Sequence, residues 1–240
     1  MKSWVAITGS SNGIGGALAE IFAREGHSII LHGRNQTDLQ RMYEKITSYG
    51  VKADIVEGDL RSQKTLDVLL QKSEENNIDI LINNVGYRCP GVTLNKITDE
   101  QIGDMFKLNL TVPIYLTRET YKRFLLKGRG CIINMNSIIG LEPRKNRTLY
   151  TASRFGLRGF TESLRLEAKE NNIRIISIYP ARVRTKPEFE YGWGVFDAAE
   201  KMYEIYAAGA PDDLILDYIK DPLSKPRSYP ISGKIYSLNQ

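Results

Sequence analysis

The sequence predicts an α/β protein with a doubly wound parallel sheet of about seven strands, flanked by helices on both faces. Three observations support this prediction. Short apolar strands alternate with amphipathic helical patterns, the strands are nearly continuous apolar runs, and a glycine-rich turn follows the first of them. Strands that alternate with helices are joined by right-handed crossovers, which make the sheet parallel. We therefore expect one domain over residues 1–240.

The expected strands are apolar runs that end in polar or glycine-containing turns, at residues 4–8, 28–31, 53–56, 78–82, 131–135, 173–178 and 234–238. Helical spacing of apolar residues separates them, at 17–25, 37–48, 62–75, 99–126 and 149–170. Residues 187–211 interrupt the alternation and are rich in aromatic side chains. We expect a substrate lid there, and the alternative is an aromatic loop packed on the body of the protein or on another subunit.

The composition is that of an ordinary globular protein. Hydrophobic residues make up 42% and charged residues 25%, which argues against a disordered, collagen-like or coiled-coil chain. No apolar run is long enough for a membrane-spanning helix, and the N-terminus has no cleavage-site pattern, so we expect a cytoplasmic protein without a membrane partner. Cys89 and Cys131 are too few for a disulfide framework, and no spacing predicts a metal site.

The chain has a net charge of +5, and its positive charge is concentrated in one segment. Between residues 144 and 186, Lys and Arg strongly outnumber Glu. A local excess of positive charge is typical of a site for an anionic ligand or of a solvated helix face. Nucleic acid is the alternative ligand for a basic protein. No nucleic-acid-binding signature accompanies these residues, so we expect no such partner.

A glycine-rich turn connects the first strand to the first helix, in the sequence Thr8-Gly-Ser-Ser-Asn-Gly-Ile-Gly15. Glycine permits a sharp turn and lets the backbone approach a pyrophosphate, whose negative charge is attracted by the free amides and the dipole of the helix. The flanking strand and helix make a dinucleotide site more specific than the glycines alone would. The candidate cofactor-binding residues in this turn are Gly9, Ser11, Asn12, Gly13, Ile14 and Gly15.

The end of the second strand indicates which dinucleotide the site prefers. An acidic residue there binds ribose hydroxyls and repels a 2′-phosphate, but this sequence has His32-Gly33-Arg34-Asn35. Arg34 can bind a phosphate through a forked, charge-assisted contact. We therefore expect NADP(H) rather than NAD(H), and the alternative is a solvent-exposed arginine at a helix start.

Tyr150 and Arg154 are four residues apart in a helical pattern, so both side chains lie on one face. Ser137 follows the strand before them. A tyrosine hydroxyl can give a proton to a developing alkoxide if its ordinary pKa of about 10 is lowered, and a nearby fixed cation lowers it by favouring the phenolate.

Together these motifs resemble the short-chain dehydrogenase/reductase family, whose Rossmann-type domain would cover nearly the whole chain. The turn from Thr8 to Gly15 is similar to TGxxxGxG, residues 83–86 are similar to NNAG, and residues 179–185 are similar to the PGxVxT segment beside the nicotinamide. The resemblance implies further cofactor contacts at Asp59, Leu60, Asn84, Gly86, Pro180, Val183 and Thr185, and a homodimer or homotetramer.

The resemblance also implies a reaction, in which hydride passes between the nicotinamide and a carbonyl or alcohol carbon. Tyr150 would be the acid/base, Ser137 would hold the substrate oxygen, and Asn109 would hold a water in a proton relay. The lysine of the family's YxxxK motif, which binds the nicotinamide ribose and lowers the tyrosine pKa, is Arg154 here. Arginine keeps the positive charge but passes on a proton poorly. An active enzyme is expected, and a silent or weak NADP-binding protein is the alternative.

The substrate prediction is a small carbonyl or alcohol compound with a negative charge. Basic side chains occur between Ser137 and Tyr150 and again after the strand at 173–178, so two segments would bring positive charge to one cleft. A sugar phosphate, an oxo acid or an acyl thioester would suit them. The candidate substrate residues are Arg144, Arg147, Arg184 and Trp193, and the alternative is contact with cofactor phosphates or solvent.

Overall fold

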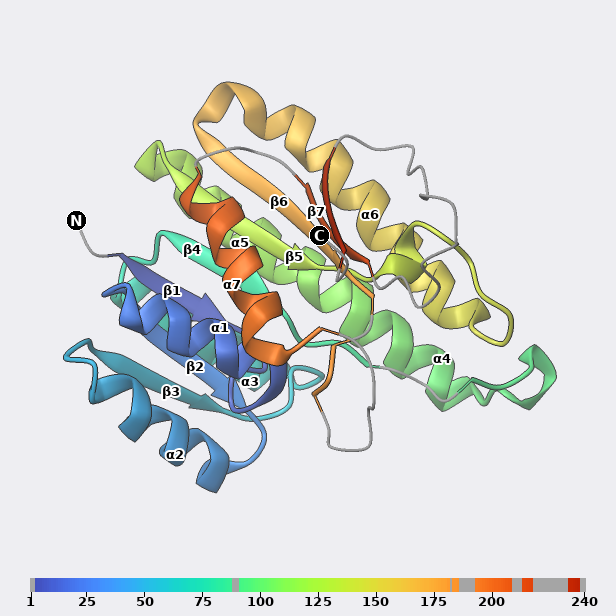
Figure 1. The fold of residues 1–240 in the computed structure, drawn as a ribbon, viewed down its shortest axis with the longest axis horizontal. Coiled ribbons are helices and arrows are strands. Elements are labelled where there is room, and N and C mark those ends of the chain that lie inside the picture. The colour runs from blue at the N-terminus through green and yellow to red at the C-terminus, as the bar shows by residue number, and fades with distance from the viewer. Residues whose placement is uncertain are drawn as a thin grey trace.

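The computed structural model describes residues 3–87, 91–181, 183–185 and 193–208, and the backbone of two strands at 213–217 and 233–237. These residues contain an eight-stranded sheet in the order β3-β2-β1-β4-β5-β6-β7-β8, with every neighbouring pair parallel (Figure 1). The strands are β1 Trp4–Ile7, β2 Ser28–Gly33, β3 Ala53–Glu57, β4 Ile80–Asn83, β5 Gly130–Met135, β6 Ile173–Pro180, β7 Asp213–Asp217 and β8 Gly233–Ser237. The predicted doubly wound α/β class is confirmed.

The sheet has one strand more than the sequence analysis expected. The additional strand is β7, which pairs with β6 on one side and β8 on the other. Its apolar run is only the three residues Leu-Ile-Leu between aspartates, and so short a run does not distinguish a strand from a loop or a helical turn. The strand order reverses between β1 and β4, where the chain leaves the β1-β2-β3 half of the sheet.

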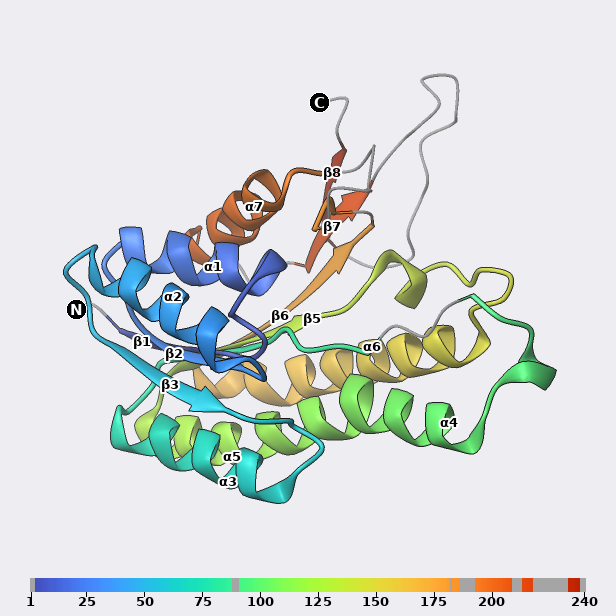
Figure 2. The ribbon, with the colours of Figure 1, turned by 90° about the horizontal axis from the view of Figure 1, so that it is seen from below.

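Helices cover both faces of the sheet (Figure 2). On one face lie α1 Gly13–Arg24, α2 Gln36–Thr47 and α7 Val195–Ala207, and on the other lie α3 Gln63–Glu75, α5 Val112–Lys127 and α6 Thr148–Ala168. The strands supply both layers because successive side chains point to opposite faces. Val5 and Ile7 of β1 pack into the core under α1 and α7, whereas Ala6 belongs to the core under α3 and α5.

The single long helix expected over 99–126 is divided. It consists of α4 Asp99–Phe106, a π-helical turn at Lys107–Thr111, and α5. Thr98 begins α4 as a capping box with Gln101, because its hydroxyl accepts the Gln101 N–H while the Gln101 side chain accepts the Thr98 N–H. Short 3₁₀ turns occur at Leu94–Lys96, Ile138–Gly140 and Lys169–Asn171.

Much of the segment predicted as a lid is a helix that packs on the body of the protein. Residues 195–207 form α7, which packs against α1 and buries Ala198, Ala199, Met202 and Ile205. Tyr203 and Tyr206 pack their rings around Phe22 of α1, with ring centroids 4.9 and 5.2 Å away. These apolar side chains gain more from the core than from a cover over a polar cleft. Residues 187–192 and 209–211 lie outside the described residues.

The described residues form neither a membrane-spanning helix nor a metal-ligand cluster. No helix among them is long and apolar enough to cross a bilayer. No three histidine, cysteine or acidic side chains of the described part gather as metal ligands would. Cys131 is buried in β5, and burial raises the pKa of its thiol to about 12. Cys89 lies outside the described residues.

Candidate active site

A cavity of about 570 Å³ opens where the strand order reverses, beside the carboxyl ends of β1, β2 and β4. This is the position at which open parallel α/β sheets bind ligands, and its volume is typical of a site for a cofactor. Twelve of the predicted cofactor residues line it, namely Gly9, Ser11, Asn12, Gly13, Ile14, Gly15, Arg34, Asp59, Leu60, Asn84, Gly86 and Thr185. The fold thus brings five separate segments to one cleft.

The glycine-rich turn between β1 and α1 requires its glycines. Gly9 and Gly13 have positive φ values of 68° and 56°, which side-chain-bearing residues rarely adopt. A Cβ on Gly15 would collide with the Gly9 carbonyl oxygen. The Asn12 side chain makes no capping hydrogen bond to α1, so the first amides of the helix remain available to an anion.

Two neighbouring strands hold this turn in place. From the end of β4, the Asn84 side chain donates to the Thr8 and Gly9 carbonyls at 2.9 and 3.0 Å, and its backbone N–H donates to the Thr8 hydroxyl at 2.8 Å. From the end of β2, His32 Nδ1 accepts the Gly9 N–H at 3.1 Å. The turn is therefore rigid before any ligand binds, which lowers the entropy cost of binding.

His32 connects the first and third strands below the cavity. Its Nδ1 is an acceptor, so the neutral ring carries the proton on Nε2, which donates to the Gly58 carbonyl at 3.1 Å. Burial lowers the pKa of His32 to about 4, although the bond to Gly58 and the charge of Asp59 act in the opposite direction. The ring is neutral at physiological pH and joins the glycine turn to the loop that carries Asp59.

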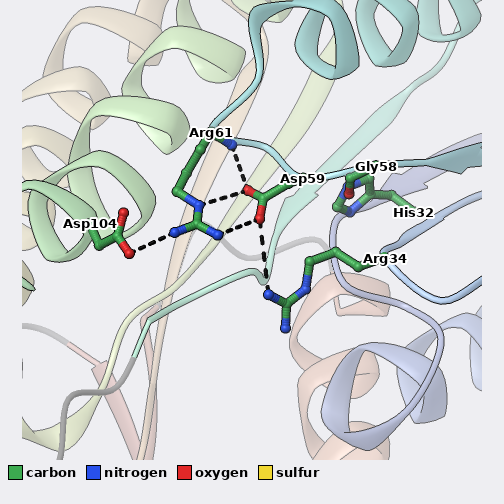
Figure 3. A network of polar contacts seen from close by, with 6 residues as sticks. All are labelled: His32, Arg34, Gly58, Asp59, Arg61 and Asp104. Atoms are coloured by element: carbon green, nitrogen blue, oxygen red, sulfur yellow. Dashed lines mark hydrogen bonds and ion pairs between the residues drawn. The ribbon is translucent and has the colours of Figure 1, made fainter. Parts of the chain in front are cut away.

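Charged side chains surround the part of the cleft beyond β2 and β3. Figure 3 shows Arg61 between two carboxylates, with Asp59 on one side and Asp104 of α4 on the other. Arg34 approaches Asp59 more loosely, with 4.0 Å between its Nη1 and Asp59 Oδ2. The hydrogen bonds from the Arg61 side chain lower the pKa of Asp59, which is ionised at neutral pH.

Ser137 and Tyr150 lie at the starts of the 3₁₀ turn Ile138–Gly140 and of α6, the two helical segments that follow β5. Ser137 caps the 3₁₀ turn Ile138–Gly140, where its hydroxyl accepts the Ile139 N–H at 3.3 Å. Tyr150 lies in the first turn of α6 and is half-buried. The Asn136 side chain, next to Ser137, donates to the Arg154 carbonyl of α6 at 3.2 Å and thereby ties the two segments together.

Arg154 is buried behind the wall of the cleft, with only 5% of its surface exposed. Its guanidinium carbon lies 5.1 Å from the centroid of the Tyr150 ring. Nη1 donates to the Met135 carbonyl at 2.9 Å, Nη2 donates to Asn109 Oδ1 at 3.4 Å, and Nε has no partner among the described residues. A Cβ on Gly86 would collide with Nη2, so the guanidinium occupies space that this glycine leaves.

Asn109 is fully buried in the π-helical turn between α4 and α5. Its side-chain amide pairs with the backbone of Tyr87, accepting from the N–H at 2.7 Å and donating to the carbonyl at 2.9 Å. It also donates to the Ser153 hydroxyl at 3.2 Å. π-Helical turns inside helices are frequent at functional sites. Here the turn joins the loop after β4 to α6.

The remaining candidates occupy different surroundings. Pro180 ends β6, and Val183 is buried and bridges to Trp193. Trp193, predicted to contact substrate, is 6% exposed and belongs to the core near α7, so little of its surface is left for a ligand. Arg144 and Arg184 are exposed, and Arg147 is half-buried at the start of α6. Arg182 lies outside the described residues.

Sequence reasoning missed some of the residues that line the cavity, namely His32, Gly33, Asn35, Asp38, Val85, Tyr87 and Leu108. Most of them adjoin predicted residues, so extending the motifs by one or two positions would have found them. No local sequence pattern predicted that Arg61 and Asp104 would pair beside the cleft. They are 43 positions apart and meet only because α4 lies beside the loop after β3.

The sequence profile of the family described as short chain dehydrogenase matches residues 3–190. An uncharacterized oxidoreductase of Staphylococcus epidermidis is 32% identical over 191 residues, which cover 77% of this chain and 80% of that protein. The chain belongs to the short-chain dehydrogenase/reductase family and is an oxidoreductase, as its motifs predicted.

Two solved structures are similar over most of the chain. A ketone-specific alcohol dehydrogenase of Comamonas testosteroni superposes with a TM-score of 0.81 at 27% identity, covering 86% of this chain and 83% of that one. A short-chain dehydrogenase of Sphingobium yanoikuyae in complex with NADPH has the same TM-score at 26% identity, covering 89% and 86%. The fold is thus that of small-molecule oxidoreductases.

Proposed function

We propose that this protein binds NADP(H) and interconverts a carbonyl and an alcohol, with Tyr150 as the acid/base. Members of its family are oxidoreductases that use a nicotinamide cofactor, and the choice of NADP(H), the role of Tyr150 and the substrate are our inferences. One observation carries the proposal. The cleft that contains the free helix N-terminus and Arg34 is also lined by Gly86. Gly86 lies against the buried Arg154 guanidinium, whose carbon is 5.1 Å from the centroid of the Tyr150 ring.

The residues of the cleft fit the proposed cofactor. Gly9, Gly13 and Gly15 leave a cradle that side chains would fill, and the amides at the start of α1 face a site for its diphosphate. Arg34 is the candidate partner of the 2′-phosphate, and the NADPH complex of the Sphingobium yanoikuyae relative supports this preference. When bound, the cofactor donates or accepts the hydride.

The protein's own groups handle the proton. Tyr150 would give a proton to the carbonyl oxygen in reduction and take it back in oxidation, while the Ser137 hydroxyl holds that oxygen. The Arg154 cation, over the Tyr150 ring, would stabilise the negative charge that develops on the Tyr150 oxygen when the hydroxyl gives up its proton. Asn109 would hold the Tyr87 loop and the Arg154 guanidinium in place.

A catalytically silent NADP-binding protein is the second candidate, and the position of Arg154 favours it. The guanidinium donates to Met135 and Asn109 rather than pointing into the cleft, and a guanidinium has no acceptor with which to relay a proton. The intact Ser137, Tyr150 and Asn109 favour activity over this alternative.

An anionic substrate remains part of the proposal. Arg147 at the start of α6 and Arg184 after β6 lie near segments that carry the site, and Arg144 is in the loop before α6. A phosphate, a carboxylate or the phosphopantetheine arm of an acyl thioester would pair with them. If Arg144→Ala, Arg147→Ala and Arg184→Ala each left KM unchanged for an identified substrate, this part would be wrong.

The test of the function is the change in nicotinamide absorbance with NADPH and a panel of phosphorylated, carboxylated and neutral carbonyl compounds. The natural protein is compared with Arg154→Lys. Turnover by the natural protein supports the enzyme, and slower turnover by Arg154→Lys would show that the site is adapted to arginine. Turnover only after Arg154→Lys would support the silent protein instead.

We further propose that the protein consists of one domain, lies in the cytoplasm and forms a homodimer or homotetramer. The helices α5 and α6 expose apolar side chains, among them Leu126 and Leu166, and such residues commonly mark a subunit contact. Light scattering during size-exclusion chromatography would measure the mass. A monomer at micromolar concentration would contradict this expectation.

A further inference from the structure

The cleft contains a conflict of charge where the proposed 2′-phosphate would bind. Arg34 lines the cleft beside Asp59, which also lines it and is ionised. A carboxylate 4.0 Å from the arginine competes with a phosphate for it and also repels the phosphate, because charges at this separation interact more strongly near a protein surface than in water. A site selective for a 2′-phosphate must therefore neutralise Asp59.

Arg61 supplies that neutralisation. Its Nε donates to Asp59 Oδ1 at 3.1 Å, its Nη2 donates to Oδ2 at 2.8 Å, and its backbone N–H donates to Oδ1 at 2.8 Å (Figure 3). This forked pair occupies both carboxylate oxygens in the geometry that suits arginine best. The Arg34 contact, at 4.0 Å, is loose by comparison, and its side chain is 75% exposed.

Asp104 holds Arg61 in this position from the other side. Arg61 Nη1 donates to Asp104 Oδ2 at 2.6 Å. All three guanidinium nitrogens are therefore hydrogen-bonded, and the group is fixed between two carboxylates. Asp104 belongs to α4, whereas Asp59 and Arg61 precede α3. Arg61 itself does not line the cavity among the described residues, so it acts on a ligand only through Asp59.

We propose that Arg61 is a specificity-determining, positioning residue: by occupying Asp59 it leaves Arg34 available to the 2′-phosphate of NADP(H). The inference rests on the coenzyme preference proposed above. Without Arg61, Asp59 presents two free oxygens to the Arg34 fork and an uncompensated negative charge to the phosphate. Both effects weaken ligands that carry the 2′-phosphate and spare those that lack it.

A purely structural role predicts a different pattern. If Arg61 only tied the loop after β3 to α4, its removal would disturb the adenosine side of the cleft for both coenzymes alike. The selectivity between paired ligands therefore separates the two roles. Because only the 2′-phosphate distinguishes them, NADPH is paired with NADH, and 2′,5′-ADP with 5′-AMP.

The experiment measures dissociation constants for these four ligands by calorimetry, with the full chain. For Arg61→Ala we expect Kd for NADPH and 2′,5′-ADP to rise about five- to tenfold, the change that loss of one charge-assisted contact gives, and Kd for NADH and 5′-AMP to stay within about twofold. Asp59→Asn in the same chain removes the competing charge, so Arg61→Ala/Asp59→Asn should recover most of the loss. Arg61→Lys keeps the charge without the fork and should be intermediate.

Arg129→Ala is the matched control. Arg129 is also an exposed arginine paired with an aspartate, Asp79. This pair lies at the amino ends of β4 and β5, whereas the cleft lies at the carboxyl ends of the strands, so none of the four dissociation constants should change. Thermal melting with and without 2′,5′-ADP checks that each variant is folded.

Two results would overturn the role of Arg61, namely equal weakening of both ligands in each pair, or no recovery in the double variant. If the natural protein itself binds NADPH no tighter than NADH, the coenzyme preference fails, and the inference fails with it. The natural protein thus tests the first proposal and the variants test the second.

Discussion

The two sides of the cleft are built on different physical principles. Toward β2 and β3, the groups are charged and lie at the surface, where Arg34 and Arg61 are exposed and Asp59 is half-buried. Toward α6, they are buried and fixed to the backbone, as Arg154 is through Met135 and Asn109 is through Tyr87. Exposed pairs contribute little to stability, whereas buried polar groups are costly to disturb. Substitutions on the first side should therefore change affinity alone, and those on the second should change packing and chemistry together.

The largest effect is expected at Tyr150. Tyr150→Phe removes the hydroxyl that would carry the proton but keeps the ring against Arg154. We expect kcat to fall about 10²- to 10⁴-fold, the usual contribution of general acid–base catalysis, with the Kd for NADPH unchanged. Stopped-flow absorbance and calorimetry measure the two quantities. Full turnover in this variant would remove Tyr150 from the mechanism.

A second prediction concerns how the unfolding free energy depends on pH through the His32 bridge. His32 lies on the side of the cleft toward β2 and β3, but it is buried. The folded-state pKa of about 4 lies below the ordinary 6.5, so the unfolded chain takes up the proton first as pH falls. Its stabilising contribution is complete above pH 6.5 and is lost as pH falls through about 4, amounting to roughly 3 kcal/mol of unfolding free energy.

Urea titrations between pH 4 and 7 measure this loss. His32→Gln should have a flatter pH dependence than the natural protein. Identical slopes in the two proteins would contradict the assignment to His32.

The packing around Arg154 gives a third prediction. A Cβ at Gly86 would collide with Arg154 Nη2, so Gly86→Ala should lower the unfolding free energy by about 1–3 kcal/mol, as overpacking of a buried site does. Gly103→Ala is the control, because nothing lies within 4 Å of the added methyl group. Arg154→Lys, whose side chain lacks the guanidinium fork, should relieve part of the loss when combined with Gly86→Ala. Additive losses would show that the two residues do not compete for space.

The smallest effect on the folded protein is expected at Arg34. Arg34→Ala should leave the melting temperature unchanged because the side chain is exposed, yet raise the Kd for NADPH about tenfold and leave that for NADH unaffected. Calorimetry and thermal melting together test this separation of affinity from stability. A lower melting temperature would break the contrast between the two sides of the cleft.

Most of the fold and the cofactor side of the site could be predicted from local patterns. The alternation of apolar strands with amphipathic helices specified the parallel sheet, and Gly9 and Gly13 lie in a turn whose positive φ values require them. β7 was missed because a three-residue apolar run is ambiguous. Residues 195–207 of the segment predicted as a lid form α7 and pack on α1, and aromatic richness alone does not reveal which surface such residues bury.

What the sequence determined by itself is the chemistry available: the Tyr150 hydroxyl, the arginine in place of lysine, the glycine turn and the lack of a carboxylate within residues 32–35. Only the tertiary structure decided what these groups contact. It placed the Arg154 guanidinium behind Gly86, made His32 a bridge between β1 and β3, and set Arg61 between Asp59 and Asp104. Such contacts join residues tens of positions apart, and their partners are fixed by how strands and helices pack rather than by any local pattern of residues.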